Sequence, residues 1–564
     1  MSNRFSPVTL EILWNRLLSI VNTAAASLYR SAFSPLIREG KDYGCILLDR
    51  QGRALVQSSG SAPSVICLSL SAVRFLEQFP PETLRPGDII ICNDPWICSG
   101  HLNDVHMLTP IFHRGRLAAM AACFAHWVDI GGRPLASENR EVFEEGVRVP
   151  IIKIAEDGRL NDALMQMIAA NLRNPDHTLG DFRAQLAANH AASREVVRLL
   201  DEYQMESLDD LATAIFARSE AAMGAAIDAI PDGIYRSQVG LDGYDAPLTL
   251  AVALRVAGNR LTVDYAGTSQ QVNYALNSCM NFTYAYTVVP LKLVTAPRIP
   301  INSGLLRPLE VTAPPGTIVN PVPPVAVGQR VLVGHFLHAA IFRALAPVLP
   351  DRVQADSGSC PNWSSSWNSI GQPRDRSFAH MFFSHGGQGA FPHRDGNPCT
   401  PFPSNVGNTP VEIMERVCPV IVEHKELRQD SGGPGRFRGG CGQRITIRCL
   451  TDIPTQVTVR CDRVRHPEHV AKGVLGGWPG TVGRVLVNGT PAANPKAEFI
   501  FRSGDTLTLE TPGGGGYGNP GERDRSRVED DLRNGLLSAN HAGQAYGFTQ
   551  EPAAVTPAAL GTEG

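Results

Sequence analysis

A small set of histidine and aspartate residues is the part of this sequence best suited to chemistry. His101 and Asp104 stand three residues apart, and His126 closes an apolar run shortly afterwards. Neutral imidazoles and carboxylates are the usual donors for zinc, manganese or iron, and such a site keeps one position for water or substrate. Asp42, at the edge of another apolar run, is the expected fourth donor. The sequence therefore predicts a divalent transition-metal site.

The same residues have a simpler interpretation that the spacing alone leaves open. His126 fits a buried, hydrogen-bonded histidine, and His101 with Asp104 fits an Asx-type turn. His106 opens a strand whose orientation the sequence does not fix, and His113 falls at a turn. We therefore leave His106 and His113 out of the predicted ligand set.

The predicted ligands fall at the ends of predicted strands. Apolar runs predict strands over 42–48, 88–92, 106–113 and 117–126. The last two flank an Arg-Gly turn, and the small and apolar residues of the fourth indicate that it is buried. An Asn-Asp-Pro sequence ends the second strand, so His101 and Asp104 lie in a loop between two buried strands. Strand ends would hold these side chains rigidly.

The rest of the chain predicts a multidomain fold that mixes α/β and α+β parts. A length of 564 residues exceeds what one hydrophobic core supports. Helical periodicity marks 7–29, 65–79 and most of 161–230, whereas glycine, proline and short strands dominate the C-terminal half. We divide the chain into a metal-binding α/β region (1–160), a helical region (161–231), a mixed α/β domain (232–430) and a β-rich, glycine-rich region (431–564).

Composition narrows the class of protein. Hydrophobic residues are 43% and charged residues 19% of the chain, with a net charge of −3, which gives no sign of a nucleic-acid partner. No stretch approaches the roughly 18 apolar residues of a membrane span, and the N-terminus does not resemble a signal peptide. We expect a cytoplasmic protein whose 12 scattered cysteines are free thiols.

Further short motifs accompany the metal-site residues along nearly the whole chain. They comprise the segments 39–43, 93–95, 100–104, 125–132, 144–146, 171–173, 180–185, 428–435, 439–440 and 511–518. Together these segments resemble the hydantoinase B family, which also includes part of 5-oxoprolinase, the caprolactamase subunit and the metal-binding subunits of acetone and acetophenone carboxylases.

The resemblance implies a role for this chain. The ligand motif of the family maps onto Asp42, His101, Asp104 and His126. In the family, a hydantoinase A-like partner subunit uses ATP to phosphorylate the amide oxygen, and the hydantoinase B chain completes the reaction. This chain has no GxxxxGK[ST] loop, in agreement with ATP being handled by the partner. A dimer of heterodimers is the expected assembly.

Several residues are candidates for supporting roles. Asp104 or Asp42 is expected to orient or deprotonate the attacking water, and Glu145 is a further catalytic candidate. Glu145 and Arg173 are alternatively surface ion pairs. Asp129 is a candidate for orienting a ligand imidazole.

Two other motifs suggest functions that we reject. Glycines 513–516 follow a predicted strand and precede no helix, so a turn is favoured over a phosphate-binding loop. Ser431 lies in a sequence that mimics the nucleophile segment of trypsin-like proteases, but those are secreted disulfide proteins.

Three functions remain after the motifs are considered. The favoured one is hydrolysis of a cyclic amide or imide such as a hydantoin, 5-oxoproline or a lactam. ATP-dependent carboxylation of a ketone is the second, and a non-catalytic partner subunit is the third. The length of the chain favours the first, and the complete ligand set argues against the third.

Overall fold

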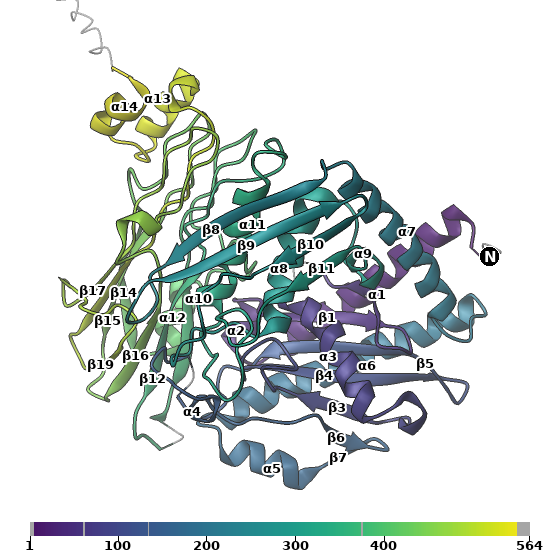
Figure 1. Ribbon diagram of the computed structural model, residues 1–564. Helices are drawn as coiled ribbons and strands as arrows, with labels where there is room; N and C mark the ends of the chain where they lie inside the picture. Colours follow the sequence, from purple (N-terminus) through teal and green to yellow (C-terminus); the bar gives the residue numbers. More distant parts are fainter. Residues whose placement is uncertain (1–4, 60–62, 134, 374–375, 550–564) are drawn as a thin grey trace, which may run out of the picture.

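Four β-sheets and the helices between them build the protein (Figure 1). The structure is a computed structural model that describes residues 5–59, 63–133, 135–373 and 376–549. The mixed, multidomain α/β class predicted from the sequence is confirmed. Within the described part of the chain, no helix is both long and apolar enough to cross a membrane.

The first sheet has seven strands in the order β2-β1-β5-β4-β3-β6-β7. Its strands are β1 (Tyr43–Leu48), β2 (Ala54–Gln57), β3 (Ile89–Cys92), β4 (Asp104–His113), β5 (Arg116–His126), β6 (Ile152–Glu156) and β7 (Arg159–Leu160). Each strand is antiparallel to its neighbours. Nine consecutive residues of β5 are buried, because helices cover both faces of the sheet at its centre.

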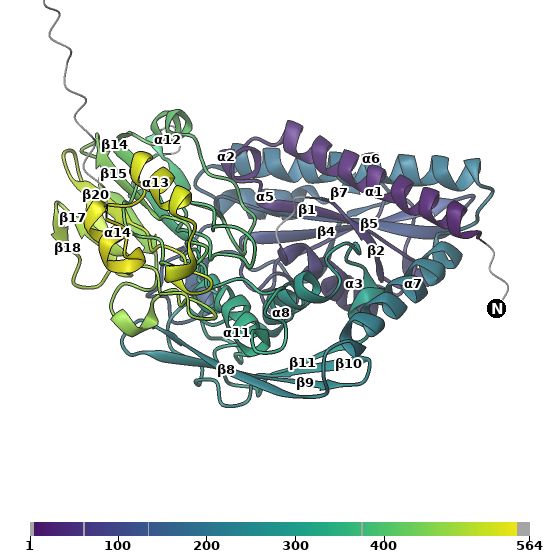
Figure 2. The same cartoon turned by 90° about the horizontal axis from the view of Figure 1, so that it is seen from above.

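Helices from distant parts of the sequence cover this sheet. Helix α1 (Pro7–Ser31) begins where the Ser6 hydroxyl accepts the Thr9 N–H, with proline in the first turn, as the sequence predicts. It lies beside α6 (Pro175–Glu202) across one face (Figure 2), and α3 (Cys67–Gln78) packs on the other. Short helices α2 (Pro35–Arg38) and α4 (Val142–Glu145) lie in the connections.

The helical middle of the chain is confirmed, but it is not a separate unit. It contains α5 (Asp162–Ala170), α6 and α7 (Asp209–Asp228). Side chains of α6 and α7 belong to the same hydrophobic core as the seven-stranded sheet. The expected boundary near residue 232 coincides with the start of strand β8 at Gly233.

A second sheet of order β11-β10-β9-β8 follows. Its strands are β8 (Gly233–Leu241), β9 (Leu248–Ala257), β10 (Arg260–Asp264) and β11 (Leu309–Thr312), and its helices are α8 (Met280–Thr295), α9 (Ser303–Leu306), α10 (Val331–Gly334) and α11 (Phe336–Leu345). Helices α8 and α11 share a core with this sheet. In Figure 1 they lie between it and the seven-stranded sheet.

Two further sheets share one apolar core in the C-terminal part. Their orders are β13-β12-β16-β19 and β14-β15-β20-β17-β18. The elements are β12 (Trp363–Ser369), β13 (Ala379–Ser384), α12 (Val411–Val417), β14 (Val420–Leu427), β15 (Gln443–Cys449), β16 (Thr455–Arg460), β17 (Arg484–Val487), β18 (Thr490–Pro491), β19 (Glu498–Phe501), β20 (Thr506–Glu510), α13 (Arg525–Arg533) and α14 (Ala539–Tyr546). Because β12 pairs with β16 and β14 with β15, the proposed division at residue 430 does not separate sheets.

Glycine-rich segments outside the regular strands pack against one another beside these sheets, and we call residues 386–397, 431–442, 471–480 and 511–518 the glycine stack. Their backbones are hydrogen-bonded directly: the Gly514 N–H donates to the Gly440 carbonyl at 3.0 Å, and the Gly440 N–H to Gln388 at 2.8 Å. A Cβ on Gly514 would lie 2.1 Å from the Gln388 carbonyl oxygen, so only glycine fits there. Residues 513–516 are therefore an extended part of this stack, and the predicted turn is wrong.

Candidate metal centre

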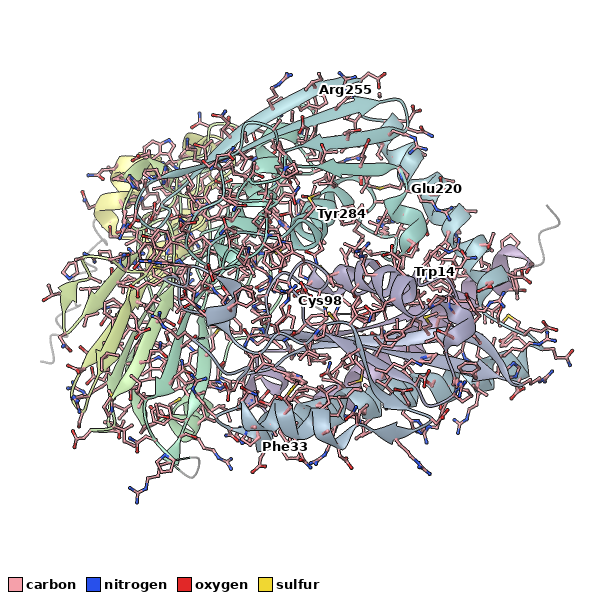
Figure 3. The ribbon with its side chains drawn as sticks, turned by 60° about the horizontal axis from the view of Figure 1, so that its bottom comes forward. Trp14, Phe33, Cys98, Glu220, Arg255 and Tyr284 are labelled. Carbon is pink, nitrogen blue, oxygen red and sulfur yellow. The ribbon has the colours of Figure 1, made fainter. Side chains whose placement is uncertain are left out.

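The predicted metal ligands meet at one edge of the seven-stranded sheet. Asp104 is the first residue of β4 and pairs with His126, the last residue of β5. Asp42 precedes β1, whose Tyr43 pairs with Ala125, and the Asp42 carbonyl accepts the His126 N–H at 3.1 Å. Antiparallel pairing thus brings two strand starts and one strand end together. Cys98, which is labelled in Figure 3, lies in the loop that carries His101 and is buried.

The donor atoms of three of these residues converge. His101 Nε2 lies 2.8 Å from Asp104 Oδ1, and His126 Nδ1 lies 3.1 Å from the same oxygen. All three side chains are at most 3% exposed. Tetrahedral zinc with bonds of about 2.0 Å places its donors about 3.3 Å apart, which is close to these separations.

The donor atoms also lack the partners that buried polar atoms normally have. Asp104 Oδ1 and both ring nitrogens of His101 make no hydrogen bond, so their contacts are close without hydrogen-bond geometry. Converging acceptor atoms that are buried and unpaired fit a divalent metal ion. Asp42 lies at the margin of this three-residue cluster: its Oδ2 is 3.4 Å from His126 Nδ1, and its side chain is 15% exposed.

Burial and charge set the protonation states of the cluster. Burial, together with the Arg330 guanidinium, lowers the pKa of His101 to about 3, so its imidazole is neutral and able to bind a metal. Burial by itself would raise the pKa of Asp104, but His101 and Arg330 outweigh it and hold the pKa well below its usual range. Burial raises the pKa of Asp42, and His126 lowers it only in part.

Two asparagines fix the loop and strand ends that carry the cluster. The Asn93 side chain donates to the Leu102 and Val147 carbonyls and accepts the Val149 N–H at 2.6 Å. The Asn103 side chain donates to the Trp127 carbonyl, and the Trp127 N–H donates back to the Asn103 carbonyl. These bonds hold the backbone on both sides of His101 and Asp104.

The neighbouring histidines have other partners. His106 lies between the hydroxyls of Ser71 and Ser99, at 2.8 and 2.7 Å from its two ring nitrogens. His113 contacts Asp201 at the far end of β4. Neither histidine belongs to the converging group of donor atoms.

The side chains of Asp129 and Ser431 are hydrogen-bonded to backbone groups. Asp129 accepts the N–H groups of Gly131 and Asn174 and pairs with Arg173, so its carboxylate holds a loop rather than a ligand imidazole. Ser431 in the glycine stack donates to the Arg428 carbonyl and accepts the Gly442 N–H. Its hydroxyl is therefore a structural group.

Glu145 is buried and makes no surface ion pair. Its Oε1 accepts the N–H groups of Val327 at 2.8 Å and Gly328 at 2.6 Å, and its Oε2 has no partner. It does not line the cavity beside His101 and His126. The contacts give Glu145 a role in positioning the segment that leads to Arg330, and its catalytic role stays a prediction.

Substitution of Glu145 separates these roles. Burial raises its pKa from 4.5 to about 8. Because the unfolded state then ionises first, the free energy of unfolding should fall as pH rises from about 4.5 to about 8. Glu145→Gln keeps the Oε1 acceptor and cannot ionise, so we expect a flatter dependence in denaturant titrations between pH 5 and 8.

Turnover gives the second measurement on this residue. We expect Glu145→Gln to remain within about threefold of wild type in kcat, whereas Glu145→Ala, which leaves two buried N–H groups unpaired, loses stability. A Glu145→Gln protein with normal metal content and folding but a kcat lowered by about 100-fold would instead identify direct general acid or base catalysis.

A cavity opens beside the ligand cluster. It measures about 20 Å³, room for about one water, and is lined by Asp42, His101, His126, Tyr286, Arg330, His335, Asn362 and Arg460 among others. Arg330 donates to Asp104 Oδ2 at 2.9 Å, and its guanidinium lies 4.3 Å from the centre of the Phe282 ring. Residues of three sheets or their helices therefore meet here.

The four residues Tyr286, Arg330, His335 and Arg460 were not predicted as site residues. They are far from residues 42–126 in sequence, and no local motif links them to the histidine–aspartate cluster. One signal was present: apart from the adjacent Gln329 and Arg330, the segment 325–334 consists of apolar and small residues, and a charged residue in such a segment requires a specific partner.

Comparison with known proteins places this site in a family. A family model described as hydantoinase B/oxoprolinase matches residues 6–520. A putative D-/L-hydantoinase B chain from a Pseudomonas species is 29% identical, covering 97% of this chain and 95% of that protein. The beta chain of the caprolactamase from Pseudomonas jessenii is 26% identical over 97% of this chain and 96% of its own length.

Solved structures share the fold. The crystal structure of the ATP-dependent caprolactamase from Pseudomonas jessenii superposes with a TM-score of 0.84 at 25% identity, covering 97% of both chains. Nucleotide-free acetone carboxylase superposes with a TM-score of 0.86 at 20% identity, covering 97% of this chain and 80% of its own. The protein thus has the multi-sheet scaffold of these enzymes around a buried histidine–aspartate cluster. It belongs to the hydantoinase B/oxoprolinase family.

Proposed function

We propose that this chain is the metal-dependent hydrolytic subunit of an ATP-dependent amidohydrolase that opens a cyclic amide or imide such as a hydantoin, 5-oxoproline or a lactam. The observation that carries the proposal is the convergence of the buried donor atoms of His101, Asp104 and His126, among which those of His101 and Asp104 have no hydrogen-bond partner. Full-length similarity to the beta chain of a caprolactamase and to a hydantoinase B chain supports the substrate class.

The division of labour follows from the chemistry of amides. The nitrogen lone pair deactivates an amide carbonyl, and phosphorylation of its oxygen makes the carbon electrophilic. Water would add to that carbon and the ring nitrogen would leave as an amine, which breaks the C–N bond; hydrolysis of the acyl phosphate by a second water would then release phosphate and the carboxylate. A hydantoinase A-like partner subunit would carry out the ATP-dependent phosphorylation. A zinc, manganese or iron ion bound to this chain would act as a Lewis acid and lower the pKa of a water towards about 7.

The side chains of the cluster take distinct roles in the proposal. His101, Asp104 and His126 hold the ion, and the Arg330 contact keeps Asp104 ionised and oriented. Asp42 is the proposed proton acceptor for the attacking water, because it lies at the margin of the group and its pKa is raised. Asp42 remains the alternative fourth ligand.

The assembly is part of the proposal. A subunit that depends on a phosphorylated substrate needs its ATP-dependent partner docked, and we propose a dimer of heterodimers. Co-purification of this chain with the hydantoinase A-like chain, followed by size-exclusion chromatography with light scattering, should give that mass. A lone monomer with full activity would contradict the assembly.

Reconstitution tests the proposed function. The metal-loaded chain and its partner should release the ring-opened product from one of hydantoin, 5-oxoproline or caprolactam, with ATP consumed in step. Omitting ATP, the partner or this chain should abolish product formation. The measurement is chromatographic detection of product beside coupled detection of ADP.

The same assay also tests the two alternative functions, a ketone carboxylase and a non-catalytic subunit. Acetone or acetophenone with bicarbonate replaces the cyclic amide in parallel reactions. ATP-dependent formation of a carboxylated ketone without ring opening would replace the proposal with a carboxylase. Ring opening by the partner alone would leave this chain a non-catalytic subunit.

A further inference from the structure

Two arginines face the cavity beside the metal-ligand cluster, and both are nearly fully buried. Arg330 and Arg460 are each 4% exposed and line the same small space. Buried guanidinium groups are normally paired with carboxylates. Arg330 has Asp104 as a partner, whereas the hydrogen bond of Arg460 runs from its Nε to the neutral Gln329 side chain at 2.7 Å.

We propose that Arg330 and Arg460 form an oxyanion subsite that receives the phosphoryl group of the substrate. The proposal rests on the proposed function and names the form in which the substrate reaches the metal site. Guanidinium groups are the preferred protein partners of phosphoryl oxygens, because their N–H groups match two oxygens at once.

The charges of the site favour a dianion over a monoanion. The charged side chains that line the cavity, with Asp104 beside them, are two carboxylates and two guanidinium groups. A divalent ion held by the cluster offsets the two carboxylates, which leaves both guanidinium charges without a counter-charge. A phosphoryl group carries up to two negative charges near neutral pH and balances them, while a carboxylate supplies only one.

Both guanidinium groups are held in place before any ligand arrives. Arg330 is fixed by Asp104 Oδ2 and by the Phe282 ring. Arg460 donates to the side-chain oxygen of Gln329, and the backbone N–H of Gln329 donates to the Ala275 carbonyl at 2.7 Å. Side chains that are already ordered lose little conformational entropy when they bind an anion.

A neutral polar side chain completes the subsite. His335 lines the cavity and is fully buried; its Nδ1 accepts the Asn362 N–H at 3.3 Å, so its unpaired Nε2 carries the proton and can donate to an oxyanion. An unpaired buried polar atom beside two guanidinium groups indicates a place for a polar ligand. A phosphoryl group is larger than one water, so the proposal requires lining side chains other than the two fixed guanidinium groups to move apart as it enters.

Calorimetric titration of the full, metal-loaded chain with inorganic phosphate at pH 8 tests the subsite without ATP, partner or turnover. We expect one saturable site in the wild type. Arg460→Met should weaken it by about 10–100-fold, the usual effect of losing a charged hydrogen bond, and Arg460→Lys by less. Metal content should be unchanged in both variants.

Matched controls make the result specific. Arg255→Met removes the same charge from an exposed position on β9 (Figure 3) and should leave phosphate binding unchanged. Arg460→Lys keeps a charge at the site if Arg460→Met fails to fold. Acetate is the monoanionic probe, and we expect it to bind at least about tenfold more weakly than phosphate.

The outcomes separate this inference from the proposed function. Phosphate binding that Arg460→Met abolishes, in a chain that opens no cyclic amide, would support the subsite and refute the function. Ring opening with no saturable phosphate site, or with binding equal in wild type and Arg460→Met, would overturn the subsite alone. Acetate binding as tight as phosphate would overturn the phosphoryl assignment.

Discussion

Replacing His101 and His126 together by alanine should reduce the metal content of the purified chain from about one transition-metal ion to about zero. The two imidazoles and Asp104 supply the converging donors, and a single carboxylate does not retain an ion against a metal-free buffer. ATP-dependent ring opening should fall by about 10³-fold or more, because Lewis-acid activation of water contributes several kcal/mol. Mass spectrometry of metals and the reconstituted assay give the two readouts.

The control uses a histidine of the same sheet that lies outside the cluster. His113→Gln, at the far end of β4, should keep both metal and activity. Circular dichroism checks that all three proteins are folded. Equal metal content in the double variant and the wild type would place the metal elsewhere and leave the non-catalytic interpretation as the one to pursue.

Gly514→Ala should destabilise the protein by about 3 kcal/mol or more, or abolish its folding. A Cβ at this position would lie 2.1 Å from the carbonyl oxygen of Gln388, and backbone on both sides leaves no space to relax. The Gly514 N–H and carbonyl are also hydrogen-bonded to Gly440 and Gly433. Urea titration followed by tryptophan fluorescence measures the loss.

A second glycine-to-alanine substitution controls for backbone entropy. Gly521 is exposed, has a negative φ, and its added Cβ would meet only the side chain of Asn519 at 3.4 Å. Gly521→Ala should change the free energy of unfolding by less than about 0.5 kcal/mol. If Gly514→Ala were as stable as Gly521→Ala, the glycine stack would not be close-packed as described.

The residue pattern alone suggested a metal site at the histidine–aspartate cluster without excluding a simpler interpretation, and the resemblance to the family supplied the full ligand set. What local sequence could predict is that these residues lie at strand ends. Asp42, Asp104 and His126 flank apolar runs that form neighbouring strands, and antiparallel pairing converts that spacing into proximity. The ends of these strands, and the start of α1, follow from residue patterns that need no distant partner. The confirmed fold class depends on the same local signals.

The other half of the site could not be predicted in this way. Arg330 and Arg460 reach the cavity through the packing of separate sheets, and no periodicity in either segment predicts that packing.

The structure of residues 513–516 was predicted wrongly for a related reason. From local sequence alone, a run of glycines indicates a turn. Residues 513–516 are instead glycines because backbone from distant parts of the chain packs against them and leaves no space for a side chain.

The glycine stack also determines the order in which parts of the chain can fold during synthesis. The segment 511–518 is bonded to segments made much earlier; the Thr511 hydroxyl, for example, donates to the carbonyl of His385, 126 residues before it. The layers that flank this segment cannot close until residues 511–518 have left the ribosome, whereas residues 42–126 and the helices that cover them emerge first. Contacts of such long sequence separation form slowly. The N-terminal half can therefore fold around the candidate metal ligands while the cavity that they share with Arg460 is still open.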